Sequence, residues 1–149
     1  MPPFIFETLL NQRIHQEEKI QKEMAICSRT LLDEQQILDQ FENDRNRVLQ
    51  EVRLKQNEGV TVSEQVLYMN FLEGMVSLIQ IQNEKVRQGE RQLDHKRLEL
   101  IEAVKKRKIL EKLKEKSQKC HMDHLLKLEQ NLLDEAAVCR FGKNFSMQT

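Results

Sequence analysis

The sequence predicts an all-α protein: a long two-helix antiparallel coiled-coil hairpin with unequal arms, in which the C-terminal helix overhangs. Three observations support this fold class. The 149 residues include only two prolines and four glycines, and both prolines lie within the first three positions. Apolar residues recur at heptad spacing, the pattern of a coiled coil. One short break, residues 57–63, interrupts them. We therefore expect a single coiled-coil domain over residues 1–149.

The first predicted helix covers about residues 5–56 and carries two interleaved heptad series. The first series consists of Leu10, Glu17, Met24, Leu31, Leu38, Arg45 and Val52. The second consists of Arg13, Ile20, Cys27, Glu34, Phe41, Val48 and Lys55. Nine of these fourteen positions are apolar, which gives the narrow apolar seam of a coiled coil. Ile14, Ile26, Leu32 and Leu49 are expected to widen the seam on one side.

Residues 57–62 form the predicted turn, and the second helix is expected to cover about residues 63–141. The hydroxyl of Ser63 is expected to cap this helix, because it can accept a backbone N–H group of the first turn. The apolar heptad positions of the second helix are Tyr68, Leu72, Met75, Ile79, Val86, Leu93, Leu100, Ala103 and Leu110. The tail, residues 142–149, is predicted to be frayed.

The register of the hairpin follows from the position of the turn. If the chain folds back at Gly59–Val60, facing residues of the antiparallel pair have numbers that add to about 120. Apolar residues then meet at six successive levels, from Val52 with Tyr68 near the turn to Leu10 with Leu110 at the far end. An incorrect register would not bring apolar residues together so regularly.

The two arms differ in length. At a rise of ~1.5 Å per residue, the first arm is about 75 Å long and the second about 115 Å. Beyond about Lys116 the second helix therefore has no expected partner in its own chain, and Lys114–His124 is almost entirely polar. Apolar residues then return as Leu125, Leu126, Leu128, Leu132, Leu133, Ala136, Ala137, Val138 and Cys139. An isolated helix is marginal in water, so this face predicts either another protein or a second copy as its partner.

A second excess of apolar residues follows the turn, between Val66 and Ile81. The seam can bury about half of them. Phe71 and Leu78, seven residues apart and off the seam, form an outward stripe with Leu67 one turn earlier. Uncovered apolar surface of this kind commonly marks a binding site, although dimerisation would also bury it.

Charge disfavours nucleic acid and membrane surfaces as partners. The chain has 24 Lys and Arg residues against 24 Asp and Glu residues, so it has no global field to attract either. Eight basic residues lie in the stretch 105–119. They spread around the helix without interleaved aromatic residues, which favours a solvated face or an acidic protein partner. No apolar stretch reaches the ~20 residues of a membrane span, and we expect a cytoplasmic location.

Catalytic, cofactor and metal sites are not predicted. The sequence has no phosphate-binding loop and no constellation of nucleophile and base, so we expect neither an enzyme nor a small-molecule substrate. Cys120, His121 and His124 lie within about one helical turn. Zinc prefers four converging ligands, and the fourth would have to be Cys139 or come from another chain. A solvated polar helix is the preferred interpretation. Three widely spaced cysteines fit a reducing compartment.

Three motifs in the correct order resemble the FliJ family of the bacterial flagellar type III export apparatus. The stretch from Gly59 to Leu72 is similar to the family pattern of Gly, an aliphatic residue, a small hydroxyl residue and then Tyr-x-x-Phe-aliphatic. Phe4-x-Phe6 followed by Leu9-Leu10 is similar to many members. The same holds for Leu132-Leu133-Asp134-Glu135-Ala136-Ala137 with Arg140-Phe141.

The resemblance implies a stalk with two partners. Its helical ends would enter the ring of the flagellar export ATPase, FliI, and promote hexamer formation. Its other part would engage the cytoplasmic region of the export gate protein FlhA, and the protein would also handle export chaperones at the flagellar base. By matching position, the expected gate contacts are Phe71, Met75, Leu78 and Gln82. The expected ATPase contacts on the overhang are Leu125, Leu128, Leu132, Leu133, Ala136 and Arg140.

Two alternatives remain at this point. The stalk protein of virulence-type type III secretion is similar in length and shape, but the Gly-Val-Thr and Tyr-x-x-Phe match favours the flagellar version. A self-associating structural coiled coil would bury its surplus apolar surface in a four-helix dimer. The polar interruption at Lys114–His124 argues against this second alternative, because a purely structural coiled coil is expected to keep its seam continuous.

Overall fold

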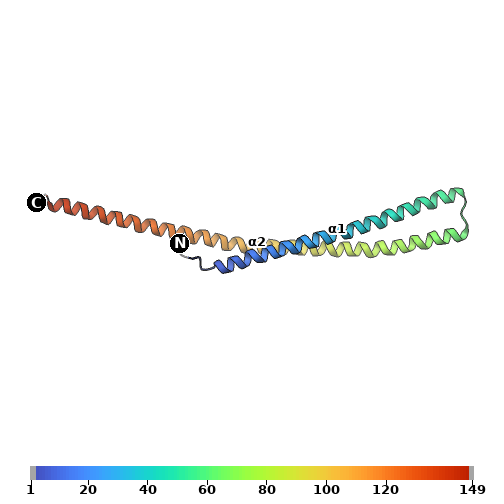
Figure 1. Cartoon of the computed structure of the whole chain (residues 1–149), viewed down its shortest axis with the longest axis horizontal. Coiled ribbons are helices and arrows are strands. Elements are labelled where there is room, and N and C mark those ends of the chain that lie inside the picture. The colour runs from blue at the N-terminus through green and yellow to red at the C-terminus, as the bar shows by residue number, and fades with distance from the viewer. Residues whose placement is uncertain (1–2, 148–149) are drawn as a thin grey trace. The chain divides into compact units, whose positions relative to one another are not determined.

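The computed structural model describes the backbone of residues 3–147 and the side-chain environments of residues 3–142. Helix α1 covers Glu7–Glu58 and helix α2 covers Val62–Met147, as Figure 1 shows. This all-α, antiparallel hairpin of two unequal helices, 52 and 86 residues long, confirms the predicted fold class. Helix α2 continues past the predicted end near residue 141. The tail that was expected to fray is thus helical as far as Met147, and residues 148–149 lie outside the described range.

The chain divides into two compact units, which we describe separately. We call Gln16–Glu102 the hairpin unit, and Met1–His15 together with Ala103–Thr149 the terminal unit. Helices α1 and α2 each contribute to both units. The single coiled-coil domain expected from the sequence stays a prediction.

The turn between the helices depends on two residues. Gly59, directly after α1, has φ 101°, a conformation that glycine adopts without the steric cost that a side chain would impose. Thr61, directly before α2, accepts a hydrogen bond at its Oγ1 from the backbone N of Glu64, at 3.3 Å. Thr61 is therefore the N-cap, in a Thr-x-x-Glu sequence typical of capping boxes. The predicted cap at Ser63 is wrong, because α2 begins at Val62 and Ser63 already lies inside its first turn.

The seam of the hairpin unit is narrow and apolar. Its core is a cluster of Leu31, Val86 and Leu93, against which Met24, Cys27 and Leu38 pack. At Gly89 the helices come close: an added Cβ there would lie only 3.1 Å from Leu31 Cδ1. Among the described residues no large side chain is completely buried, because two helices alone cannot surround one. The stability of this unit therefore depends on a single row of interhelical contacts.

The observed register matches the predicted one. Leu31 lies opposite Gly89, Glu23 bonds to Lys96, and Lys55 lies over the Tyr68 ring, so facing residue numbers add to about 120, as an antiparallel pair folded at Gly59–Val60 requires. The expected widening of the seam is only partial: Ile14 and Leu49 are half-buried, whereas Ile26 and Leu32 are exposed. Lys55, placed in the core series, is also exposed. A single partner helix covers only the narrow stripe at its own heptad positions.

In the terminal unit, the start of α1 packs against α2. Leu10, Ala103 and Leu110 are buried, and the Glu7 carboxylate accepts from Lys114 Nζ at 3.0 Å and 3.1 Å. Ahead of α1, the rings of Phe4 and Phe6 meet edge to face, with centroids 5.8 Å apart. These contacts end at His121, the last half-buried residue of α2 within the described range.

Candidate partner-binding surfaces

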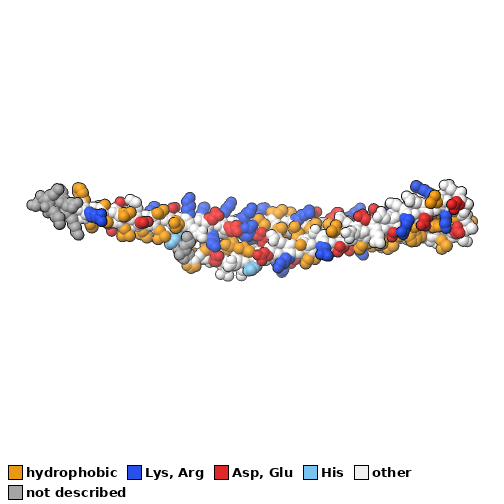
Figure 2. All heavy atoms as spheres, turned by 45° about the horizontal axis from the view of Figure 1, so that its top comes forward, with side chains coloured by type: hydrophobic (Ala, Val, Ile, Leu, Met, Phe, Trp, Pro, Cys, Tyr) orange, Lys and Arg blue, Asp and Glu red, His pale blue; other side chains and the backbone are white. Residues whose placement is uncertain are grey.

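The part of α2 that follows the last intrachain contact is the first candidate surface. We call residues 122–142 the leucine segment. Every side chain in it is exposed, including Leu132 at 66%. Figure 2 shows hydrophobic side chains along this part of α2, next to the grey end. Water-exposed leucines on a helix without a neighbour are the kind of surface that a partner covers.

The apolar face of the leucine segment follows the seam only in part. Within this segment, the heptad series of Ala103 and Leu110 reaches residues 124, 131 and 138, and two of these are the polar residues His124 and Asn131. The other heptad series of the seam reaches Leu128, which lies five full helical turns after Leu110 and therefore on the same side of α2. Helix α1 begins at Glu7, which pairs with Lys114, so covering the leucines beyond this point requires a different partner.

The residues expected to contact the ATPase all lie on the surface. They are Leu125, Leu128, Leu132, Leu133, Ala136 and Arg140, and all are exposed. Helical geometry brings five of them onto one face, with Leu128 at its edge. Arg140 lies beside Leu133, toward the edge opposite Leu128, and adds one cationic group to this face.

The second candidate surface lies in the hairpin unit, after the turn. Phe71 and Leu78 are 47% and 46% exposed, and Leu67 is exposed beside them. The other two residues expected at the gate contact are buried: Met75 is 6% exposed and Gln82 is 4% exposed. Both occupy heptad seam positions facing α1, so neither is accessible to a partner in this arrangement. The candidate surface is thus the stripe of Leu67, Phe71 and Leu78, which we call the turn-end stripe.

Hydrogen bonds to Glu34 explain why the polar side chain of Gln82 is buried. Its Nε2 donates to the backbone oxygen of Glu34 at 2.9 Å and also to the Glu34 carboxylate. A buried amide is tolerated when its donors are satisfied. A polar pair within an apolar seam also favours one register of the two helices over others. Gln82 therefore fixes the alignment of the helices near the turn-end stripe.

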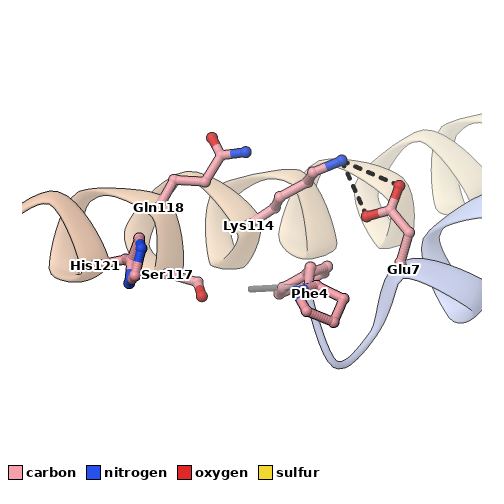
Figure 3. Close-up of a pocket in the computed structure, with 7 residues that line it drawn as sticks. Phe4, Glu7, Lys114, Ser117, Gln118 and His121 are labelled. Atoms are coloured by element: carbon pink, nitrogen blue, oxygen red, sulfur yellow. Dashed lines mark hydrogen bonds and ion pairs between the residues drawn. The ribbon is translucent and has the colours of Figure 1, made fainter. Parts of the chain in front are cut away.

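A hollow of about 280 Å³ marks the place where intrachain packing in the terminal unit ends. Pro3, Phe4 and Glu7 line it from the start of the chain, and Lys114, Ser117, Gln118 and His121 line it from α2. Figure 3 shows Phe4 below α2, beside the Glu7–Lys114 ion pair. The aromatic ring and this ion pair attach the first residues of the chain to α2 just before the leucine segment begins.

Electrostatics in the hairpin unit stabilise the interhelical seam. Lys96 Nζ donates to Glu23 Oε2 at 2.7 Å and to Glu99 Oε2 at 3.1 Å. The hydrogen bond from Lys96 lowers the pKa of Glu23, and the hydrogen bond to Glu23 raises the pKa of Lys96. Nearer the turn, hydrogen bonding to Tyr68 raises the pKa of Lys55, whose Nζ lies 5.3 Å from the centroid of the Tyr68 ring.

Metal chemistry has no geometric basis in the described part of the chain. Among residues 3–142, no three His, Cys, Asp or Glu side chains lie close enough together to hold a metal ion. Cys120 and Cys139 are exposed free thiols, and Cys27 is a half-buried one. Within the same range, neither helix contains a stretch with the length and apolar character that crossing a bilayer requires.

Comparison with protein families gives a match to the flagellar FliJ protein over residues 4–145. The chain belongs to the FliJ family. The match includes both the turn-end stripe and the leucine segment. As a FliJ-family member, the chain is a component related to flagellar protein export. Neither curated proteins nor solved structures gave a match.

One feature of this FliJ-family chain was missed by sequence reasoning. The basic residues of 105–119 were expected to spread around the helix. Four of them, Lys108, Lys112, Lys116 and Lys119, are spaced by four, four and three residues, which places them on one face. All four are exposed. We call them the lysine stripe. The signal that identifies the stripe is the spacing of these four lysines, which follows the 3.6-residue helical period within a run that is basic on several sides.

Proposed function

We propose that this flagellar export component acts as a stalk for the export ATPase, FliI. The leucine segment enters the ATPase ring and promotes hexamer formation. The turn-end stripe engages the cytoplasmic region of the gate protein FlhA, so that the chain links the ring to the gate. The protein acts in the cytoplasm at the flagellar base, assists export chaperones, and performs no catalysis of its own.

The leucine segment is the single observation that carries this proposal. All 21 of its residues are exposed, and they follow His121, the last half-buried residue of α2 in the described range. Burial of one leucine side chain stabilises a complex by about 1.5–3 kcal/mol, so several leucines supply the free energy for a firm association. A ring that encloses one helix offers such burial from several sides.

The first experiment compares two neighbouring substitutions in the full-length chain. Leu132→Asp introduces a charge on the apolar face, whereas Asn131→Asp introduces the same charge about 100° away, outside that face. We expect Leu132→Asp to weaken ATPase binding at least tenfold, because it removes about 1.5–3 kcal/mol of apolar burial. It should also abolish the rise in ATP hydrolysis at sub-saturating ATPase concentration. Asn131→Asp should leave both nearly unchanged.

Circular dichroism of both variants separates binding from folding. Both positions are exposed, so helicity should equal that of the unmodified chain. Equal ATPase binding by the two variants would contradict the proposal. A loss of helicity in Leu132→Asp alone would assign the leucine to the fold.

The gate contact is tested by a second matched pair. Phe71→Ala truncates the turn-end stripe, and Met69→Ala truncates an exposed residue on the other side of α2. We expect Phe71→Ala to weaken binding to the FlhA cytoplasmic region and to leave ATPase binding intact. Met69→Ala should leave both unchanged. A parallel loss of gate and ATPase binding in Phe71→Ala would contradict a two-ended stalk.

Self-association is the second candidate function, because a second copy would also cover the exposed leucines. Sedimentation of the free protein distinguishes the two. A dimer that dissociates in Leu132→Asp, together with no effect of the chain on ATP hydrolysis, would favour a structural coiled coil. A virulence-type stalk remains the alternative of the same architecture, and binding to a virulence ATPase in preference to FliI would favour it.

A further inference from the structure

The terminal unit carries a charged surface that the proposed function does not use. We infer that the lysine stripe docks on an acidic protein surface, belonging to the same partner that encloses the leucine segment. This inference rests on the proposed function. It adds that the partner must present carboxylates at the edge of the opening that receives the helix, arranged along one side of that helix.

The stripe is geometrically continuous. Lys108, Lys112 and Lys116 are one helical turn apart, and Lys119 follows three residues later. At about 100° per residue, the four lie within about 80° of the helix circumference. At ~1.5 Å per residue they extend over about 16 Å. A row of this length and width can face one surface with all four ammonium groups at once.

Two neighbouring basic groups are already paired within the described part of the chain, whereas the four lysines of the stripe are not. Arg107 Nη1 bonds to Glu111 Oε1 at 2.7 Å, and Lys114 bonds to Glu7. None of the four lysines forms an ion pair with a described residue. Acidic residues near the stripe are Glu115 at its edge and Asp123 beyond its end. In a chain with zero net charge, four aligned cations leave a local excess of positive charge.

The position of the stripe points to the partner of the leucine segment. Lys119 and Met122 are three residues apart on the same helix, or about 5 Å. A body that covers the leucine segment therefore has its edge at Lys119 and Lys116. Complementary charge at an interface edge steers encounter and fixes orientation, whereas the apolar interior supplies most of the affinity.

An anionic membrane is a less suitable surface for this stretch. Helices that lie on a bilayer bury a wide apolar face beside their lysines. Here the apolar face is already used within the terminal unit, because Ala103 and Leu110 are buried. Proteins that bind single-stranded nucleic acid use aromatic side chains for base stacking, and the stretch 105–119 contains no aromatic residue.

The test uses the full chain and the purified ATPase. In the lysine variant, all four stripe residues are replaced by Gln. In the control variant, four exposed basic residues of the hairpin unit are replaced by Gln, which gives the same change in charge; they are Lys22, Arg29, Lys85 and Arg87. Kd and the association rate are measured from 50 to 300 mM NaCl. Binding to vesicles that contain phosphatidylserine is measured in parallel.

We expect the lysine variant alone to show a Kd raised about tenfold at low salt, mostly through slower association, and a weaker dependence on salt. Equal effects of the two variants would overturn the inference, because they would reflect net charge only. Unchanged ATPase binding by the lysine variant, with or without lost vesicle binding, would overturn it and leave the proposed function intact. No ATPase binding by the unmodified chain would overturn both.

Discussion

Two glycines inside α2 provide a direct test of the interhelical packing in the hairpin unit. A Cβ added at Gly74 would meet nothing within 4 Å, whereas one added at Gly89 would lie 3.1 Å from Leu31 Cδ1 and 3.7 Å from Leu31 Cβ. Gly is about 1 kcal/mol less favourable than Ala in a helix interior. Gly74→Ala should therefore raise the free energy of unfolding by about 1 kcal/mol, with no opposing contact.

Gly89→Ala should give little or no gain. The same ~1 kcal/mol of helix propensity is opposed by displacement of the Leu31 tip, which packs within the cluster of Val86 and Leu93. An off-rotamer side chain costs about 0.5–1.5 kcal/mol, so the two contributions nearly cancel. A larger residue has no room, because the Leu31 Cα lies 3.8 Å away. Gly89→Leu should destabilise the unit by about 1–3 kcal/mol.

Denaturant unfolding followed by far-UV circular dichroism measures these differences. In a Leu31→Ala background the crowding is removed, so Gly89→Ala should then stabilise by about 1 kcal/mol, as Gly74→Ala does. For a chain of this size, 1 kcal/mol corresponds to about 2–4 °C in Tm. If Gly89→Ala stabilised the unmodified chain as much as Gly74→Ala, the close approach of the helices at Gly89 would be refuted.

Three further predictions concern the seam, the cap and an ion pair. Leu31→Ala should lower the free energy of unfolding by about 2–3 kcal/mol and Leu32→Ala by less than about 0.5 kcal/mol, because only Leu31 is buried. Equal losses for the two variants in denaturant unfolding would contradict the observed register. Thr61→Ala should cost about 1 kcal/mol and Thr61→Ser much less, measured as the midpoint of unfolding. Glu23→Gln should destabilise at neutral pH. The Glu23 pKa is lowered from 4.5, so this difference should disappear as pH falls through that lowered value. The Lys96 pKa is raised from 10.5, so the stabilisation by the Glu23–Lys96 ion pair is also lost as pH rises through that raised value. A difference in stability between Glu23→Gln and the unmodified chain that does not depend on pH would exclude the ion pair.

The sequence was sufficient for the fold class and the register because heptad spacing determines both. The opposition of Leu10 to Leu110 and of Leu31 to Gly89 follows once the turn is placed at Gly59. The N-cap could not be located in this way. Thr61 and Ser63 both carry a hydroxyl group that can cap a helix. Which of them is the N-cap depends on a shift of two residues in the start of the helix, and a sequence pattern locates helix ends only to within one or two residues.

The site residues were predicted less completely, for a different reason. Phe71, Met75, Leu78 and Gln82 are spaced by four, three and four residues, so they lie close to one side of α2. Yet the boundary between covered and exposed positions passes between them. Met75 and Gln82 belong to the seam, as their own heptad series requires. A family resemblance indicates which positions along the chain correspond to a contact. Whether a side chain at such a position is buried depends on which side of α2 is covered by α1.

The position of the turn has a consequence for the order in which the chain folds. Interhelical contacts connect residues 48 apart at Gln82 and Glu34, 73 apart at Lys96 and Glu23, and 107 apart at Lys114 and Glu7. The Lys55–Tyr68 contact next to the turn closes a loop of only about a dozen residues. Closing the largest loop first would cost about 2 kcal/mol more in chain entropy than closing the smallest. Pairing is therefore fastest when it begins at Gly59 and Thr61 and proceeds away from the turn, each contact shortening the next loop. The leucine segment takes no part in these interhelical contacts, and during synthesis it emerges after the residues that form them.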